Sequence, residues 1–66
     1  MTIQFTSLRG NTLTGRTVSD IKIKGQRVYF VRMLHKLYAI TDGYAVDEAE
    51  DSADMVQFTQ QVALQL

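Results

Sequence analysis

The stretch "RVYFVRML", residues 27–34, is the most strand-like run in the chain, and the predicted fold is built outward from it. Successive side chains of a strand point to opposite faces. Val28, Phe30 and Leu34 therefore share one face, while Tyr29, Val31 and Met33 share the other. Because both faces are apolar, the pattern predicts a central strand that is covered on both sides.

Three more strands are predicted around this one, over residues 2–9, 12–24 and 37–41, with the central strand over 27–34. Turn residues separate them: Gly10-Asn11, Gly25-Gln26, His35-Lys36 and Asp42-Gly43. Gly15 interrupts the second strand and predicts a bend there. Short connections of this kind favour an antiparallel meander.

The spacing of apolar residues changes in the last third of the chain. From Met55 onward they recur at Val56, Phe58, Val62 and Leu66, which is the period of an amphipathic helix. The helix is predicted over about 48–65, with its start between Asp47 and Ser52. The acids of "DEAEDSAD" would then lie on its first turns, where the helix dipole favours negative charge. Leu64 falls outside the apolar arc.

The sequence therefore predicts one α+β domain over residues 1–66, a three- or four-stranded antiparallel β-meander followed by one C-terminal helix packed on one face. The predicted core is Ile3, Phe5, Ile21, Ile23, Val28, Phe30, Leu34, Val56, Phe58, Val62 and Leu66. One helix covers only one face of a sheet. Tyr29, Val31 and Met33 should therefore be under-covered or sealed by a second copy, so we expect a homodimer through the sheet or the helix.

Composition limits the classes of function. The chain has 66 residues, no cysteine and a single histidine, His35, so neither a disulfide nor a structural metal or cofactor site is expected. No run approaches the 18 apolar residues of a membrane span. A soluble, cytoplasmic protein is expected.

The motif "GNTLTGRT", residues 10–17, is one residue short of a phosphate-binding loop, with Arg16 in place of the lysine. That loop needs a helix directly after it, whose positive end binds the phosphates. The following "VSDIKIKG" alternates Ile21 and Ile23 with lysines, which is strand periodicity. We interpret Gly10 and Gly15 as turn and bulge residues.

Residues for catalysis are sparse. A Ser-His-Asp arrangement would need His35 to meet Asp42 or Asp20 across a turn. Carboxylate pairs could be drawn from 47–54, but acid and base work needs a cleft for which a small domain has little room. The stretch "DEAEDSAD" lacks the glycine and the spacing of a calcium loop. We predict that the protein is not an enzyme.

Charge is strongly segregated along the chain. Residues 1–36 hold seven basic residues and one acidic residue, whereas residues 37–66 hold six acidic residues and no basic one, so the halves carry +6 and −6. The acidic segment is Asp47, Glu48, Glu50, Asp51 and Asp54. Such a compact negative surface predicts a non-enzymatic protein-binding module that occupies a basic surface of a larger partner, such as a nucleic-acid-binding protein. Small nucleic-acid-mimic inhibitors, including many encoded by phages, have this general character.

The alternative prediction is a nucleic-acid-binding module. It uses the basic set, Lys22, Lys24, Arg27, Tyr29 and Arg32. With the helix on the face of Ile21 and Ile23, most of these residues and Tyr38 would form the open face, although Arg32 shares the other face. Cations that follow a phosphate backbone and rings that stack on bases form single-stranded nucleic-acid platforms. The same pattern is also consistent with an ordinary solvated sheet face, and with an acidic segment that only balances the basic sheet.

Overall fold

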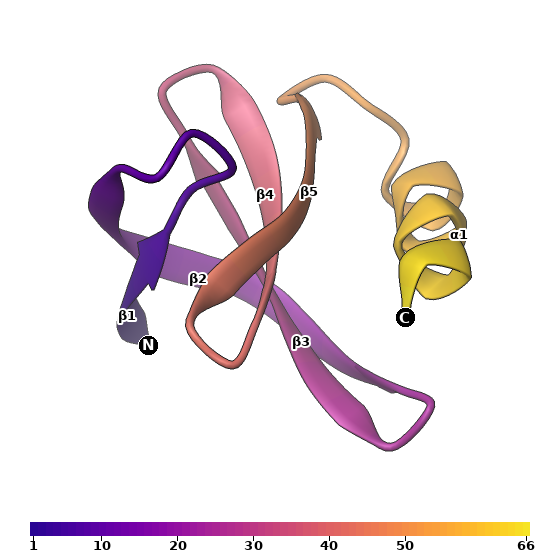
Figure 1. The fold of residues 1–66 in the computed structure, drawn as a ribbon. Helices are drawn as coiled ribbons and strands as arrows, with labels where there is room; N and C mark the ends of the chain where they lie inside the picture. Colours follow the sequence, from indigo (N-terminus) through magenta and orange to yellow (C-terminus); the bar gives the residue numbers. More distant parts are fainter.

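A computed structural model describes all 66 residues as five strands and one helix (Figure 1). The elements in chain order are β1 (Thr2–Thr6), β2 (Thr12–Ile23), β3 (Gln26–Met33), β4 (Lys36–Thr41), β5 (Tyr44–Glu50) and α1 (Met55–Gln65). The α+β class and the C-terminal helix are confirmed. The predicted three or four strands are wrong, because there are five.

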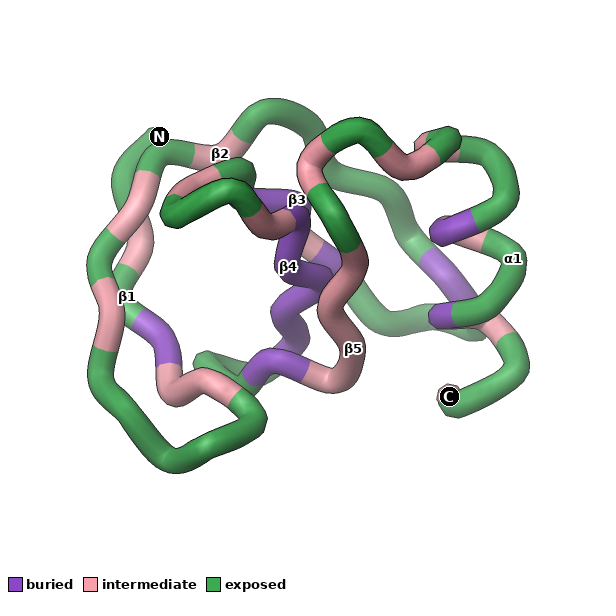
Figure 2. The backbone as a smooth tube through the Cα atoms, turned by 90° about the horizontal axis from the view of Figure 1, so that it is seen from above, coloured by how far each residue is buried: buried purple, intermediate pink, exposed green.

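The five strands form a closed barrel in which sequential neighbours pair antiparallel. β1 and β5 close it through one parallel bridge, Thr6 with Tyr44, where the N–H of Thr6 donates to the carbonyl of Gly43 at 2.8 Å. Seen from above, the strands form a ring and α1 lies outside it (Figure 2). The barrel thus has an interior, two ends, and an outer face that the helix partly covers.

The missed strand is β5, in a region that was predicted to start the helix. Asp42 and Gly43 both have positive φ, 54° and 81°, which defines a type I′ turn. That turn directs the chain back along β4, so residues 44–50 pair with residues 36–41. An acidic residue near a helix N-terminus stabilises the helix by only about 0.3–1 kcal/mol. This is less than the free energy that a whole strand gains from pairing and packing.

The helix therefore begins at Met55, not near residue 48. Asp54 is its N-cap, and its Oδ1 accepts hydrogen bonds from the backbone N–H groups of Val56 at 2.8 Å and Gln57 at 3.1 Å. No acidic residue lies in the first turn. The acidic segment lies on β5 and on the loop before the helix.

Strand ends also differ from the prediction by a few residues. β1 stops at Thr6 rather than residue 9, because Gly10 donates its N–H to the carbonyl of Ser7 and closes a loop. The turns after β2 and β3 are Lys24-Gly25 and Leu34-His35, one residue earlier than expected, and all four residues have positive φ. All three hairpins with two-residue turns are therefore of type I′.

The core consists of two clusters, one on each side of the barrel wall. The interior cluster is Phe5, Val31, Tyr38, Ile40 and Ala45, flanked by Ile3, Leu13 and Met33. The outer cluster is Ile23, Val28, Phe30, Leu37, Ala39, Phe58 and Val62, and it lies between the strands and α1. The alternation predicted for residues 27–34 therefore serves both clusters: Val28 and Phe30 face the helix, while Val31 and Met33 face the interior.

Closure of the barrel corrects several predictions about the core. Val31 is fully buried inside the barrel, so no second copy is needed to seal it, and Tyr38 is 5% exposed rather than on an open face. Three residues predicted as core are instead exposed: Ile21 at 41%, Leu34 at 66% and Val56 at 67%. Ile21 lies on the part of β2 that is paired only with β3, and Leu34 lies in the β3–β4 turn. Val56 faces outward from α1.

The Leu34-His35 turn gives a first prediction. Leu34 in particular is poorly suited to a left-handed conformation, which costs roughly 1–2 kcal/mol for an ordinary L-residue. Replacing the pair by Asn-Gly (Leu34→Asn with His35→Gly) should raise the free energy of unfolding by about 1–2 kcal/mol, measured by urea denaturation. Leu8→Asn, which removes another exposed leucine from a loop, should leave it unchanged. A double variant no more stable than wild type would mean that the turn is not strained.

Candidate functional site

The acidic segment lies at one end of the barrel, beside the β3–β4 turn. In Figure 1 this is the upper end, where β5 finishes and the chain crosses to α1. The backbone N–H of Asp51 donates to the carbonyl of His35 at 3.2 Å, which fixes the end of β5 against that turn. The carboxylates are thus presented from ordered backbone.

Asp47 points toward the helix and binds within the molecule. Its Oδ2 accepts a hydrogen bond from Nε2 of Gln65 at 2.7 Å, and its Oδ1 accepts one from the backbone N–H of Glu48 at 2.8 Å. The bond from Gln65 ties β5 to the last turn of α1. Asp47 therefore lies on the helix side of β5, whereas Glu48 and Glu50 lie on the opposite side, at the end of the barrel (the barrel-end side).

Glu48 and Glu50 share a face with Lys36 of the neighbouring strand. Glu50 is the direct cross-strand partner of Lys36, and Oε1 of Glu48 lies 3.6 Å from its Nζ. Oδ2 of Asp51 lies 3.9 Å from Nδ1 of His35, whose side chain is 97% exposed. Lys36 is therefore the one permanent cation in salt-bridge contact with the segment.

The acidic segment carries a formal excess of negative charge. Five carboxylates with one lysine give residues 36 and 47–54 a net charge of −4 at neutral pH when His35 is neutral. The structure brings Glu48, Glu50 and Asp51 together around the end of β5, while Asp54 serves the helix start. The set is a charged rim rather than a single flat face.

An exposed leucine and a small hollow adjoin this rim. Leu34 stands 66% exposed in the β3–β4 turn, and a hollow of about 210 Å³ opens beside it. The lining residues are Ser7, Arg9, Asn11, Leu13, Leu34, Lys36, Tyr38 and Glu48. Sequence reasoning assigned Leu34 to the core, because it continues the alternation of β3 and only the turn geometry removes it.

The basic set is only partly assembled. Lys22, Arg27 and Tyr29 lie on one face of the β2–β3 hairpin, opposite the helix, as their cross-strand register requires. Arg32 is paired with Leu37, which packs in the outer cluster, so it lies on the other face, as its alternation predicted. Lys24 is drawn toward the end of the chain, where its Nζ donates to the carbonyl of Leu66 at 2.7 Å.

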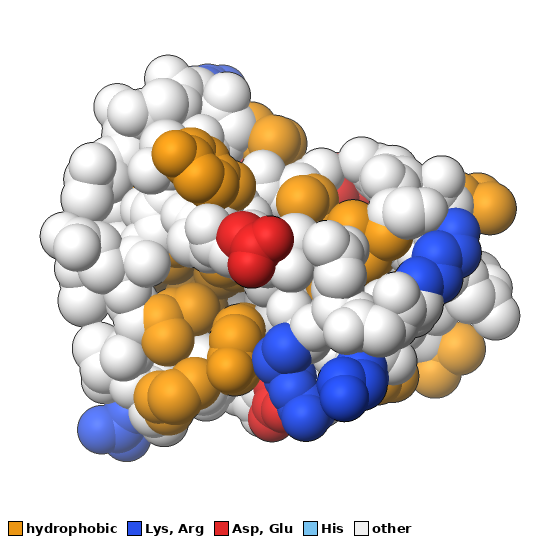
Figure 3. All heavy atoms as spheres, turned by 60° about the horizontal axis from the view of Figure 1, so that its bottom comes forward, with side chains coloured by type: hydrophobic (Ala, Val, Ile, Leu, Met, Phe, Trp, Pro, Cys, Tyr) orange, Lys and Arg blue, Asp and Glu red, His pale blue; other side chains and the backbone are white.

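Acidic residues offset the cations that do come together. Nη1 of Arg27 lies 2.9 Å from Oδ2 of Asp20. In the space-filling view of this end, cationic side chains are interrupted by acidic and apolar ones (Figure 3). At this end, the two cations Lys22 and Arg27 are balanced by the two carboxylates Asp20 and Asp42, so these four residues together carry no net charge.

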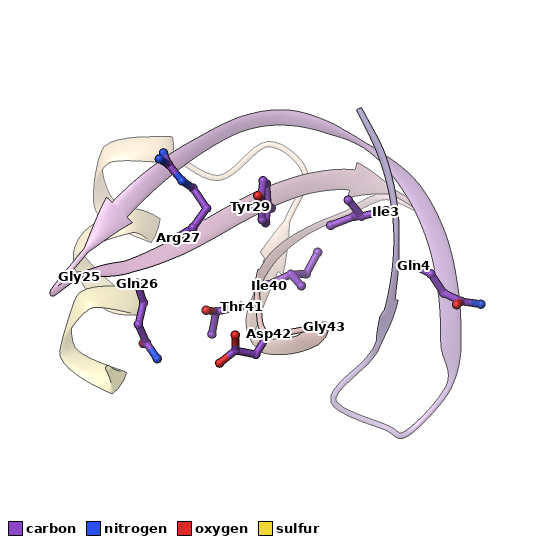
Figure 4. A pocket seen from close by; sticks show the side chains of 10 residues that line it. All are labelled: Ile3, Gln4, Gly25, Gln26, Arg27, Tyr29, Ile40, Thr41, Asp42 and Gly43. Atoms are coloured by element: carbon purple, nitrogen blue, oxygen red, sulfur yellow. The ribbon is translucent and has the colours of Figure 1, made fainter.

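A second, wider hollow of about 500 Å³ opens at this end of the barrel (Figure 4). Ile3, Tyr29 and Ile40 supply its apolar part, and its polar rim includes Gln26, Thr41 and Asp42. Gln4 points away from it, whereas its neighbour Ile3 points inward. The hollow is open and of mixed polarity.

His35 lies far from the partners considered for catalysis: its carboxylate neighbour is Asp51, whereas Asp42 lies in the turn between β4 and β5. No group of three or more His, Cys, Asp or Glu side chains is arranged to hold a metal ion. The single helix, of 11 residues, is too short to cross a membrane. No family model, curated protein or solved structure matches the chain.

Proposed function

We propose that the protein is a non-enzymatic binding module that occupies a basic surface of a larger protein through its acidic segment. The observation that carries this proposal is the excess of negative charge: Glu48, Glu50 and Asp51 lie around the end of β5 with Lys36 as the one lysine in salt-bridge contact, and Asp47 and Asp54 add further negative charge nearby. An acidic surface of this kind accelerates association with a basic partner and sets its orientation. A partner that normally binds nucleic acid offers such a surface, and an inhibitor or regulator would act by covering it.

Leu34 supports a protein as the partner rather than a small cation. Protein interfaces combine an apolar anchor in a pocket with a polar rim. Leu34 is largely exposed, and it lines the same hollow as Glu48. It is the anchor of the proposed interface, and Glu48, Glu50 and Asp51 form the rim beside it.

Charge reversal tests the proposal. The Glu50→Lys/Asp51→Lys variant should lose at least about tenfold in affinity for a basic protein captured from lysate, since like charges would then face each other. The measurement is the Kd for that isolated partner at low and physiological salt, beside Leu34→Ala, which should also weaken binding. Glu50→Gln/Asp51→Asn and its matched control Asp20→Asn/Asp42→Asn make the same charge change at the two ends of the molecule. Equal loss from these two pairs would refute the assignment of the site.

Nucleic-acid binding is the second candidate function. The observation that favours it is the shared face of Lys22, Arg27 and Tyr29, with the tyrosine lining the wider hollow. An electrophoretic shift with single-stranded DNA and RNA that weakens steeply with salt, and is lost in Lys22→Glu/Tyr29→Ala, would support it. In that case Glu50→Lys/Asp51→Lys should bind nucleic acid as well as wild type or better. Absence of any shift would refute this candidate.

A further inference from the structure

We infer that two copies of the chain associate through the outer edge of β2, centred on Ile21, as a symmetric antiparallel pair. β1 pairs with β2 only as far as Arg16, and Met1 adds a last contact when its carbonyl accepts from the N–H of Thr17 at 2.8 Å. Beyond that point β2 has β3 on one side and no strand on the other. Residues 18–22 are all exposed.

The hairpin geometry determines which backbone groups are free. In an antiparallel ladder, alternate residues direct N–H and C=O to the partner strand, and the residues between direct theirs away from it. A two-residue type I′ turn at Lys24-Gly25 makes its flanking residues, Ile23 and Gln26, the first pair that bonds inward. Ile21 is then bonded inward as well. Asp20 and Lys22 direct their backbone groups to the open edge.

An exposed edge of this kind binds another strand unless charge or shape prevents it. The charges here are self-complementary in one register only. With the two-fold axis at Ile21, Asp20 of one copy lies opposite Lys22 of the other, and the same pair repeats across the axis. An axis at Asp20 would oppose two aspartates, and an axis at Lys22 would oppose two lysines. Four backbone hydrogen bonds from Asp20 and Lys22 fit the favoured register.

The charges within one copy provide a further reason. Lys22 is directly opposite Arg27 in the β2–β3 register, and directly opposed like charges destabilise a pair of strands. Asp20 reaches Arg27 diagonally at 2.9 Å and leaves Lys22 without a carboxylate. In the paired form, Asp20 of the second copy lies beside Lys22. Ile21, 41% exposed in one copy, contacts its counterpart across the axis.

Disulfide trapping tests the register directly, because the chain has no cysteine of its own. Facing residues of a pair without mutual backbone bonds have Cα atoms about 4.5 Å apart, which a disulfide can bridge. Ile21→Cys should form a covalent dimer on mild oxidation. The control is Leu64→Cys, which is 87% exposed on the helix and should form far less. Equal trapping of both variants, or no trapping of Ile21→Cys, would overturn the inference.

Charge reversal supplies a second, reversible test by sedimentation equilibrium at protein concentrations up to about 1 mM. Lys22→Asp should weaken dimerisation about tenfold or more while leaving the monomer folded, since it opposes two aspartates between copies and removes the Lys22–Arg27 repulsion. Asp20→Lys/Lys22→Asp should restore the dimer. Arg32→Asp makes the same charge change on β3, away from the edge, and should have no effect. A wild-type chain that stays monomeric, or a dimer that Lys22→Asp leaves intact, would overturn the inference.

Discussion

Phe58→Ala is expected to lower the free energy of unfolding by about 3–5 kcal/mol. Phe58 is 1% exposed and packs edge-on against Phe30, with ring centroids 6.0 Å apart. Truncating a buried phenylalanine costs about 3–5 kcal/mol. A 66-residue domain has a total stability of roughly 3–10 kcal/mol, by the usual 0.05–0.15 kcal/mol per residue. The loss is therefore a large fraction of the total, and at the lower end of that range it would unfold the domain.

The physical reason lies in how α1 is held. The helix has 11 residues, and an isolated helix of that length is marginal in water. Phe58 and Val62 are the helix residues that are fully buried in the outer cluster. Loss of the Phe58 ring removes most of the apolar contact that keeps α1 folded, and it exposes Phe30 on the barrel wall.

Circular dichroism at 222 nm during urea denaturation measures this effect. Val56→Ala is the matched control: it lies in the first turn of the same helix, it is 67% exposed, and its change should stay within about 0.5 kcal/mol. A loss below about 1 kcal/mol for Phe58→Ala would show that the helix is dispensable to the barrel.

The parts of the fold that were predicted correctly are those that local alternation determines. Phe5, Ile23, Val28 and Phe30 were assigned to the core from strand periodicity, and all are buried. Phe58 and Val62 were assigned from helical periodicity and are buried as well. In each case the period alone selects the buried face, whichever element covers it.

Barrel closure could not be predicted in the same way. Apolar residues on both faces of β3 are equally consistent with a flat sheet sealed by a second copy and with a closed barrel. The bridge that decides between them is a single pair, Thr6 with Tyr44, 38 positions apart and with no distinctive residue types. Closure is a non-local property, so local patterns contain no signal for it.

β5 was missed for a different reason, because a signal was present. The composition of "YAVDEAE" is poor in strand-forming residues apart from its tyrosine and valine, and its acids favour a helix start. Asp42-Gly43 before it is the strongest short-range indication of a hairpin, and a hairpin requires a strand on both sides. The missed strand also changes the candidate site. The sequence predicts the carboxylates as one group. Side-chain alternation along β5 instead separates Asp47, on the helix side, from Glu48, on the barrel-end side.

Gly15→Ala is expected to cost about 1–3 kcal/mol, the range for overpacking a filled core. Gly15 lies on β2 opposite Ile3, where the strand passes over the barrel interior. A methyl group there would be 2.5 Å from Cγ1 of Val31 and 3.0 Å from Sδ of Met33. The methionine is flexible and can move, whereas Val31 is fully buried and has no space to retreat into.

The sign of this effect identifies its cause. In the middle of a strand, alanine is ordinarily more favourable than glycine by about 0.5–1 kcal/mol, so a backbone with no special requirement predicts stabilisation. Any loss in Gly15→Ala must therefore come from the contact with Val31. Val31→Ala removes the two γ carbons and leaves space for the new methyl group. Gly15→Ala should then be neutral or stabilising in the Val31→Ala background, a coupling of at least about 1 kcal/mol in a double-mutant cycle. The same cost in both backgrounds would place the strain elsewhere, since the only rigid side chain near the added methyl group would already have been shortened.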